Sequence, residues 1–192
     1  MSATLSTMLE LGTKAPFFEL PDTDGITVSL DDVQSEKGIL IMFICNHCPY
    51  VIHLNGALVD FANEYKEKGI ECIAISSNDI ESYPQDSPEL MKEISDKYQF
   101  PYPYLFDESQ EVAKSYKAAC TPDFFLFNDD LKLVYRGQFD DSRPGNGKPV
   151  TGRDMRIATD ALIKSKETVK PQVPSMGCNI KWKSGNEPEY FK

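Results

Sequence analysis

The feature that most constrains the fold is a continuous apolar run at residues 39–44, followed by an amphipathic segment. The run reads Ile-Leu-Ile-Met-Phe-Ile and comes directly after Gly38. Its branched side chains and short length favour a strand buried on both faces, although periodicity alone leaves a buried helix open. After Pro49, apolar residues recur every three or four positions, which predicts a helix ending near Lys68-Gly69. The residues of this stripe are Val51, Leu54, Leu58, Phe61 and Tyr65.

The rest of the chain continues the alternation of strand and helix. A second buried strand is predicted at 70–76, and Ser87-Pro88-Glu89 opens a helix that runs to about Tyr98. The remaining predicted elements are a hairpin of 17–20 and 26–30, an extended segment at 102–106, a helix at 111–116, a hairpin of 124–127 and 131–135, and a helix at 154–164. This order predicts an α/β protein with a mixed central sheet flanked by helices, as in the thioredoxin fold.

Length and composition favour one domain. The chain has 192 residues, of which 41% are hydrophobic, enough for a single packed core. Pro, Gly and Ser gather near 142–152 and after 170, and neither stretch divides the chain in two. We expect a domain at 1–170 with an N-terminal β-hairpin, and a C-terminal extension at 171–192. Trp182 and Tyr190 would anchor this extension on the domain.

Charge and the lack of targeting signals restrict the partners and the compartment. The formal net charge is -10, with 30 acidic and 20 basic residues. This balance disfavours nucleic acid and anionic membranes, which attract clustered Lys and Arg. The N-terminus lacks the basic and apolar regions of a signal peptide, so we expect a cytoplasmic protein. In a reducing compartment, a close cysteine pair is expected to be catalytic, redox-sensing or metal-binding.

The five cysteines include one closely spaced pair, Cys45 and Cys48, in the sequence Cys-Asn-His-Cys. The pair lies where the first buried strand ends and the long helix begins. Unpaired N–H groups and the helix dipole at this point would stabilise a thiolate, which is the nucleophile in disulfide exchange. A spacing of three residues also allows the two sulfurs to form a disulfide. These residues therefore predict a redox dithiol that needs no organic cofactor.

The alternative interpretation of the pair is half of a zinc site. Such a site needs two further ligands, and the chain offers only a few scattered candidates. They are His47, His53, Cys72, Cys120 and Cys178. None of these forms a second metal-spaced pair, so we predict no resident metal. Cys72 lies inside a predicted strand, where a cysteine is usually a small buried apolar residue.

The segment Cys120-Thr121-Pro122 precedes another predicted strand, where a proline could adopt the cis isomer. With this segment, the chain resembles the thioredoxin-like superfamily, specifically redoxins related to alkyl hydroperoxide reductase and thiol-specific antioxidant, in a peroxiredoxin-like subgroup that carries Cys-x-x-Cys. The resemblance covers nearly the whole chain. It is carried by residues 43–51 (FICNHCPYV), 120–127 (CTPDFFLF), 135–141 (YRGQFDD) and 177–183 (GCNIKWK).

The resemblance implies roles for further residues. Pro122 would be a cis-proline facing the dithiol, and the backbone beside Thr121 could pair with an extended substrate segment. His47 precedes the second cysteine, where an imidazole could stabilise the reduced thiolate; a solvent-facing position is the alternative. Cys120 and Cys178 are candidates for additional redox cysteines, with simple packing as the alternative for each.

Two enzymatic functions remain open at this stage. The first is thiol–disulfide exchange with protein or small-molecule disulfides, in which Cys45 attacks, Cys48 resolves, and an unidentified thiol reductant restores the dithiol. The second is a thiol peroxidase in which Cys48 becomes a sulfenic acid and Cys45 or Cys178 condenses with it. Typical peroxiredoxins have Pro and Thr seven and three residues before the peroxidatic cysteine, whereas this chain has Ile41 and Cys45. We therefore favour exchange, with a metal-binding or interaction protein as a third, weaker alternative.

Overall fold

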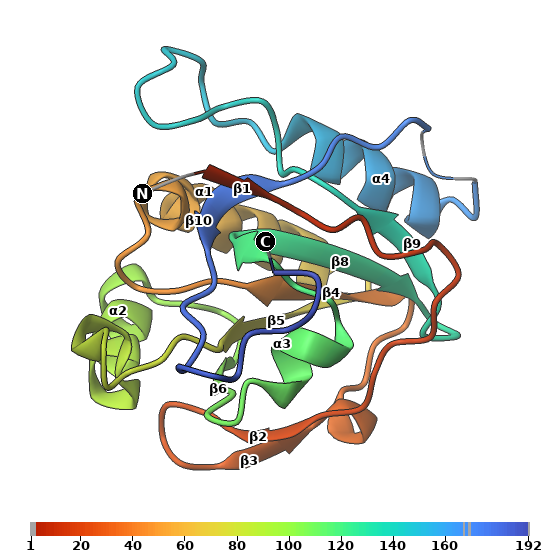
Figure 1. Cartoon of the computed structure of the whole chain (residues 1–192). Coiled ribbons are helices and arrows are strands. Elements are labelled where there is room, and N and C mark those ends of the chain that lie inside the picture. The colour runs from red at the N-terminus through yellow and green to blue at the C-terminus, as the bar shows by residue number, and fades with distance from the viewer. Residues whose placement is uncertain (1–2, 167, 169, 192) are drawn as a thin grey trace.

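The computed structural model describes residues 3–166, 168 and 170–191. Within these residues, the central sheet has the strand order β6-β5-β4-β8-β9 (Figure 1). β4 runs parallel to β5, and β5 runs parallel to β6, while β8 is antiparallel to both β4 and β9. The strands are β4 (Gly38–Phe43), β5 (Ile70–Ser76), β6 (Tyr104–Phe106), β8 (Asp123–Asn128) and β9 (Leu133–Arg136). This mixed sheet confirms the predicted fold class.

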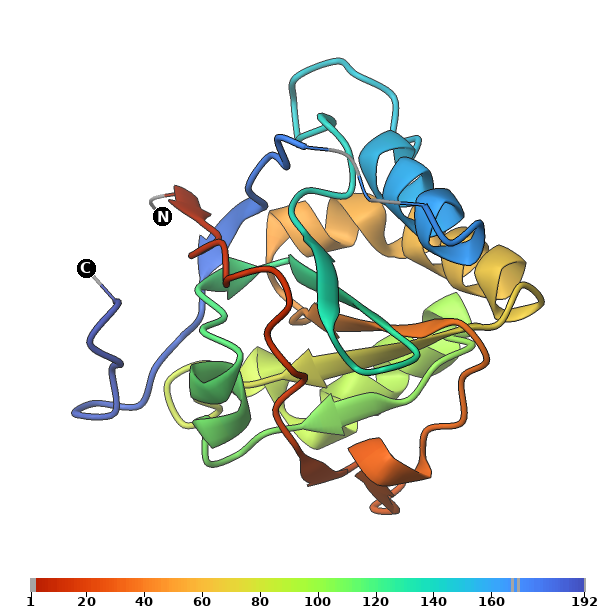
Figure 2. The ribbon, with the colours of Figure 1, turned by 90° about the vertical axis from the view of Figure 1, so that its right-hand side faces the viewer.

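Helices and a hairpin cover the two faces of the sheet (Figure 2). Leu40 and Met42 of β4 pack in the cluster that includes α1 (Pro49–Lys66), α2 (Pro88–Tyr98) and α4 (Arg153–Ile163). The intervening residues Ile39, Ile41 and Phe43 pack in a second cluster with α3 (Glu111–Ser115) and the hairpin of β2 (Glu19–Pro21) and β3 (Thr27–Ser29). Burial on both faces explains why the β4 sequence is apolar without alternation. Two 3-10 helices, η1 (Leu30–Asp32) and η2 (Pro84–Asp86), complete the helical elements.

A second sheet joins the two ends of the chain, and we predicted no strand for any of its members. Its order is β1-β10-β7, with β1 (Ala3–Leu5), β10 (Met176–Asn179) and β7 (Cys120–Thr121). Figure 1 shows β1 and β10 side by side. Both pairings of β10 are antiparallel, and Cys178 lies opposite Thr121. Beyond β10, the buried Trp182 packs against Tyr190, whose hydroxyl lies within hydrogen-bond distance of the Ala118 carbonyl (3.0 Å) and the Ala113 carbonyl (3.3 Å).

Across residues 3–166, 168 and 170–191, none of the helices has the length and apolar character that crossing a membrane requires.

Candidate active site

The Cys-x-x-Cys segment lies between β4 and α1, as predicted. Cys48 is the N-cap of α1, and Pro49 occupies the first helical turn, where its missing N–H has no helical partner to lose. The two cysteines are almost completely buried, with 2% of Cys45 and 0% of Cys48 exposed. Neither cysteine is therefore open to solvent in this conformation.

Thr121 contacts both sulfurs. Its hydroxyl Oγ1 lies 3.4 Å from Cys45 Sγ, and its carbonyl oxygen lies 3.1 Å from Cys48 Sγ, where it accepts a hydrogen bond from Cys48 when this thiol is protonated. The peptide bond between Thr121 and Pro122 is cis, in agreement with the sequence interpretation. The structure thus brings together the dithiol and the segment at 120–122, which are more than 70 residues apart in sequence.

The two thiols have opposite pKa shifts. Hydrogen bonding by the Cys45 thiol lowers the pKa of Cys48 to about 5 against the opposing effect of burial, and Cys178 assists with its thiol and its backbone N–H. The pKa of Cys45 is raised well above its ordinary value, because its thiol donates to Cys48, because it is buried, and because Asp86 is negatively charged. The helix cap itself carries no side-chain hydrogen bond. The reduced site therefore holds its thiolate on Cys48, stabilised mainly by neighbouring cysteines.

His47 is held by a buried carboxylate. Its Nδ1 lies 2.7 Å from Oδ2 of Asp86, and its ring stacks on Tyr83 with the centroids 5.5 Å apart. The fully buried Asp86 also accepts hydrogen bonds from the backbone N–H of Asn46 (2.9 Å) and the side-chain amide of Asn78 (2.8 Å). His47 Nε2 is buried without a hydrogen-bond partner among the described residues. The role of His47 as a thiolate stabiliser stays a prediction, since its contact is with Asp86.

Sequence reasoning missed Asp86 and the residues around it. Asp86 lies in η2, 39 residues after His47, and Pro84-Gln85-Asp86 matches no catalytic motif. Tyr104 in β6 donates to Asn46 Oδ1 at 3.1 Å, so the residue between Cys45 and His47 is fixed as well. Asn78, Asp86 and Tyr104 come from three separate segments, and only the fold brings them to the dithiol.

The other cysteines fall into two groups. Cys178 lies in β10 opposite Thr121, packs in the same buried cluster as Cys48, and helps to lower the pKa of Cys48. Cys120 is adjacent to Thr121 but fully buried, and its thiol donates to the Pro122 carbonyl at 3.5 Å. Cys72 lies in β5, where burial raises its pKa. Cys178 is thus the cysteine that joins the pair, and Cys72 is a packed apolar residue, as expected from its strand.

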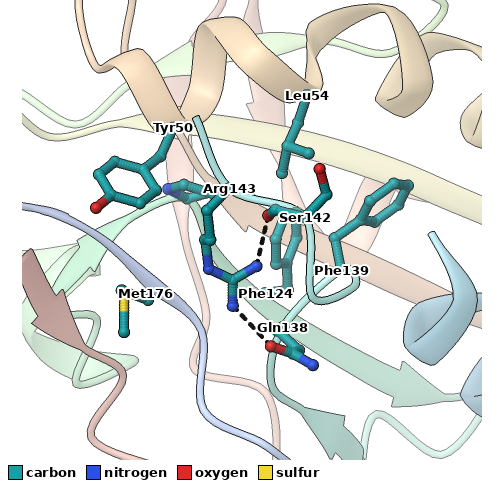
Figure 3. Close-up of a pocket in the computed structure, with 9 residues that line it drawn as sticks. Tyr50, Leu54, Phe124, Gln138, Phe139, Ser142, Arg143 and Met176 are labelled. Carbon is teal, nitrogen blue, oxygen red and sulfur yellow. Dashed lines mark hydrogen bonds between the residues drawn. The ribbon is translucent and has the colours of Figure 1, made fainter. Parts of the chain in front are cut away.

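A small pocket lies beside the cis-proline (Figure 3). Arg143 spans it, with Nη2 donating to Gln138 Oε1 at 2.6 Å and Nη1 to the Ser142 carbonyl at 2.7 Å. Tyr50 of α1 and Met176 of β10 line the same pocket, together with Pro122. The guanidinium is thus held by neutral oxygens near the redox segment.

Three potential metal ligands also meet at the site. Cys45, His47 and Asp86 each offer one ligand atom, and these three atoms all lie within 4.8 Å of one another. Sulfur, imidazole and carboxylate are ligands that zinc accepts, although a structural zinc site takes four of them. The arrangement keeps a metal-binding alternative open to experiment.

A dithiol at a strand-to-helix junction, facing a cis-proline segment beside a mixed α/β sheet, defines a thioredoxin-fold thiol redox protein. The particular family follows from a match over residues 11–136 to the AhpC/TSA family model. The chain belongs to this family, which confirms the resemblance seen in the sequence.

Individual relatives agree with this assignment. A crystal structure of an uncharacterized conserved protein from Geobacillus kaustophilus is 55% identical and superposes with a TM-score of 0.93, covering 95% of this chain and 97% of that one. The thiol-disulfide oxidoreductase ResA of Bacillus thuringiensis subsp. konkukian is 26% identical, over 66% of this chain and 68% of ResA. Peroxiredoxin Q from Triticum aestivum chloroplasts is 31% identical, over 55% of this chain and 45% of that protein.

Proposed function

We propose that the protein is a thiol–disulfide oxidoreductase that uses Cys45 and Cys48 as a dithiol/disulfide couple. The observation that carries this proposal is a pair of buried sulfurs that both contact Thr121, beside cis Pro122, and whose pKa values shift in opposite directions. One sulfur is thereby ready to attack while the other retains a proton. Disulfide exchange through a mixed disulfide requires one thiolate that attacks and a second thiol that later resolves the intermediate.

The direction of the pKa shifts assigns the steps. The Cys48 thiolate attacks a substrate disulfide, forming a mixed disulfide and releasing one substrate sulfur as a thiolate, which takes up a proton. Cys45 then loses its proton and attacks Cys48 Sγ, which releases the second substrate sulfur and leaves the Cys45–Cys48 disulfide. The substrate gains two electrons and the protein loses two. This order reverses the roles expected from the sequence, where Cys45 attacked first.

The proposed partners are protein or small-molecule disulfides and a thiol reductant that regenerates the dithiol. The relative named as a thiol-disulfide oxidoreductase supports this reading of the substrate class. A cytoplasmic location belongs to the same proposal, as do Thr121 and Pro122 as substrate-contacting residues. The acidic charge of -10 supports partners other than nucleic acid or anionic membrane surfaces.

The test is exchange between the fully reduced protein and a small aromatic disulfide, with release of the aromatic thiol followed by absorbance. We expect rapid exchange that is lost in Cys48→Ser and that, in Cys45→Ser, forms the mixed disulfide on Cys48 but no Cys45–Cys48 disulfide. Cys72→Ala serves as the matched control, because Cys72 is buried outside the site. Exchange at equal rates in Cys48→Ser and the wild type would overturn the proposal.

A thiol peroxidase is the second candidate, favoured by the lowered pKa of Cys48, which lies at the peroxidatic position. The reduced protein should be mixed with hydrogen peroxide in stopped flow, with Trp182 fluorescence recorded and quenched samples mapped by mass spectrometry. Fast oxidation through a Cys48 sulfenic acid would make the protein a peroxidase. Stoichiometric zinc after anaerobic purification, with loss of thiol reactivity, would instead favour the metal-binding alternative at Cys45, His47 and Asp86.

A further inference from the structure

We propose that Cys178 is a third redox-active thiol of the site, which β10 places where an extended substrate segment would dock, and that it forms a disulfide with Cys48. The inference rests on the proposed exchange function and adds an internal partner to it. Three observations carry it: the pairing of β10, the contact between Cys178 and Cys48, and the anchoring of the strand on both sides.

The pairing of β10 imitates an added substrate strand. β7 ends at Thr121, immediately before Pro122, and β10 pairs with it antiparallel in the register Cys178 to Thr121 and Asn179 to Cys120. Strand addition is a general way in which an extended peptide binds an exposed sheet edge. Here the protein's own chain occupies that edge, so a substrate that pairs with Thr121 must first displace β10.

The contact places a sulfur against the nucleophile. Cys178 packs in the same buried cluster as Cys45 and Cys48, and it lies opposite Thr121, whose carbonyl oxygen is 3.1 Å from Cys48 Sγ. The thiol and the backbone N–H of Cys178 also help to lower the pKa of Cys48. Burial, together with the neighbouring Cys48 thiolate, raises the pKa of Cys178 to about 12, so Cys178 carries the proton in the reduced state. Once Cys48 is in a disulfide, its negative charge is gone, and one of the causes that keep Cys178 protonated is removed.

β10 is held in place by contacts on both sides of Cys178. Gly177 packs so closely on Thr121 that a Cβ at this position would collide with the Thr121 carbonyl oxygen. On one side, the backbone N–H of Ser6 donates to the Ser175 carbonyl at 2.9 Å, which continues the pairing with β1. On the other, the N–H of Lys181 donates to Asn78 Oδ1 at 2.8 Å. Asn78 also holds Asp86, so β10 is tied to the network around His47.

The chemical step balances without an external oxidant once the Cys45–Cys48 disulfide has formed. Cys178 loses its proton and attacks Cys48 Sγ, the bond between Cys45 and Cys48 breaks, and Cys45 leaves as a thiolate that takes up a proton. One disulfide and one thiol are present before and after, so the oxidation state of the protein is unchanged. The exchange moves the disulfide to Cys48–Cys178 and links β10 covalently to the start of α1.

The test uses Cys45→Ser, in which Cys178 is the candidate resolving thiol, with glutathione disulfide as the probe. Cys48 should acquire glutathione, and Cys178 should then displace it, leaving a Cys48–Cys178 disulfide that peptide mapping detects. In Cys45→Ser/Cys178→Ser, the glutathione adduct should persist at least about tenfold longer. Cys45→Ser/Cys72→Ala is the matched control and should behave as Cys45→Ser. Circular dichroism of every variant checks folding, and Cys178→Ala replaces Cys178→Ser if the hydroxyl disturbs the strand.

The outcomes separate this inference from the function on which it rests. An adduct in Cys45→Ser that lasts as long as in the double variant, with no Cys48–Cys178 peptide, would overturn the role of Cys178. If the wild type still formed Cys45–Cys48 and released glutathione, the exchange function would stand. If Cys48 reacted with glutathione disulfide in no variant, wild type included, the exchange function and the inference would both fall.

Discussion

Asp86 Oδ2 lies 2.7 Å from His47 Nδ1, so a carboxylate from η2 orients the imidazole between the two redox cysteines. The same carboxyl group receives hydrogen bonds from Asn46 N–H and the Asn78 amide. The buried carboxylate of Asp86 is stabilised by these three hydrogen-bond donors. A neutral side chain at this position would be a weaker acceptor for each of them. Asp86 therefore links the conformation of the Cys-x-x-Cys segment to the ionisation of its first thiol.

Asp86→Asn should lower the pKa of Cys45 and destabilise the protein. The negative charge of Asp86 helps to raise the pKa of Cys45, so a neutral amide should increase the thiolate fraction at a given pH. Weakened hydrogen bonds should cost about 1–3 kcal/mol of unfolding free energy. Thiolate absorbance titrated in a Cys48→Ser background measures the first effect, and urea denaturation measures the second.

A matched control separates these effects. Asp107 is also fully buried and accepts hydrogen bonds from Ser77 and Ser109 and from the Ala113 N–H, away from the cysteines. Asp107→Asn should destabilise the protein without changing the Cys45 titration. Equal shifts of the Cys45 pKa in the two variants would contradict the assigned role of Asp86.

Stability of the reduced protein should depend on pH through Cys48. Its pKa is about 5 in the folded protein and about 8.5 in an unfolded chain. Between these values the folded state binds fewer protons, so the contribution of Cys48 to stability rises with pH, is fully present above about pH 8.5, and is lost as pH falls to about 5. The slope should be at most about 1.4 kcal/mol per pH unit.

This contribution can be isolated as the difference in unfolding free energy between the reduced wild type and Cys48→Ser. The difference should grow between about pH 5 and pH 8. In the disulfide form Cys48 has no proton to lose, so the oxidised protein should lack this pH-dependent contribution to the free energy of unfolding. A difference independent of pH in the reduced state would contradict a thiolate on Cys48.

Gly177→Ala should displace β10 from β7. The added methyl group collides with the Thr121 carbonyl, and overpacking of this kind costs about 1–3 kcal/mol. We expect lower stability and faster alkylation of Cys48 by iodoacetamide, followed by peptide mapping. Gly56→Ala in α1 is the control: a Cβ there meets open space, and alanine should stabilise the helix without exposing Cys48. Unchanged alkylation in Gly177→Ala would show that β10 does not cover the sulfur.

Trp182→Ala should loosen the tail that follows β10. The indole is buried against Tyr190, and truncation of a buried Trp typically costs about 3–5 kcal/mol. Thermal unfolding measures the loss, and alkylation of Cys48 should accelerate as in Gly177→Ala. Phe191→Ala, at a partly exposed position of the same tail, should have little effect on either measurement. Equal effects of the two substitutions would argue against Trp182 as the anchor.

The fold was predictable because its long elements have strong local patterns. The buried run before Cys45 and the apolar stripe after Pro49 correspond to β4 and α1, and β5 and α2 match the predicted ranges. The dithiol could be found from spacing and context, and the segment at 120–122 from its proline. Each of these signals is contained in a short stretch of sequence.

The second sheet and the hydrogen-bond partners of the site could not be predicted in the same way. β1, β7 and β10 have two to four residues each, too short for a periodic pattern, and they pair over nearly the full length of the chain. Asp86 has no distinguishing neighbours in the sequence. The proposal that Cys48 is the attacking thiol also needed the structure, because the pKa shifts behind it depend mainly on neighbouring side chains, among them Cys45, Cys178 and Asp86.

β10 is the central strand of its sheet, so hydrogen exchange at its backbone amides reports how often the active-site sulfurs become accessible. Both its neighbours, β1 and β7, hold it by backbone hydrogen bonds, and the sulfurs beneath it are nearly inaccessible. A bulky substrate can reach them only while those bonds are broken, in a local unfolding event that deuterium exchange measures directly. We therefore expect the opening rate of β10 to set an upper limit on turnover with the proposed protein substrates.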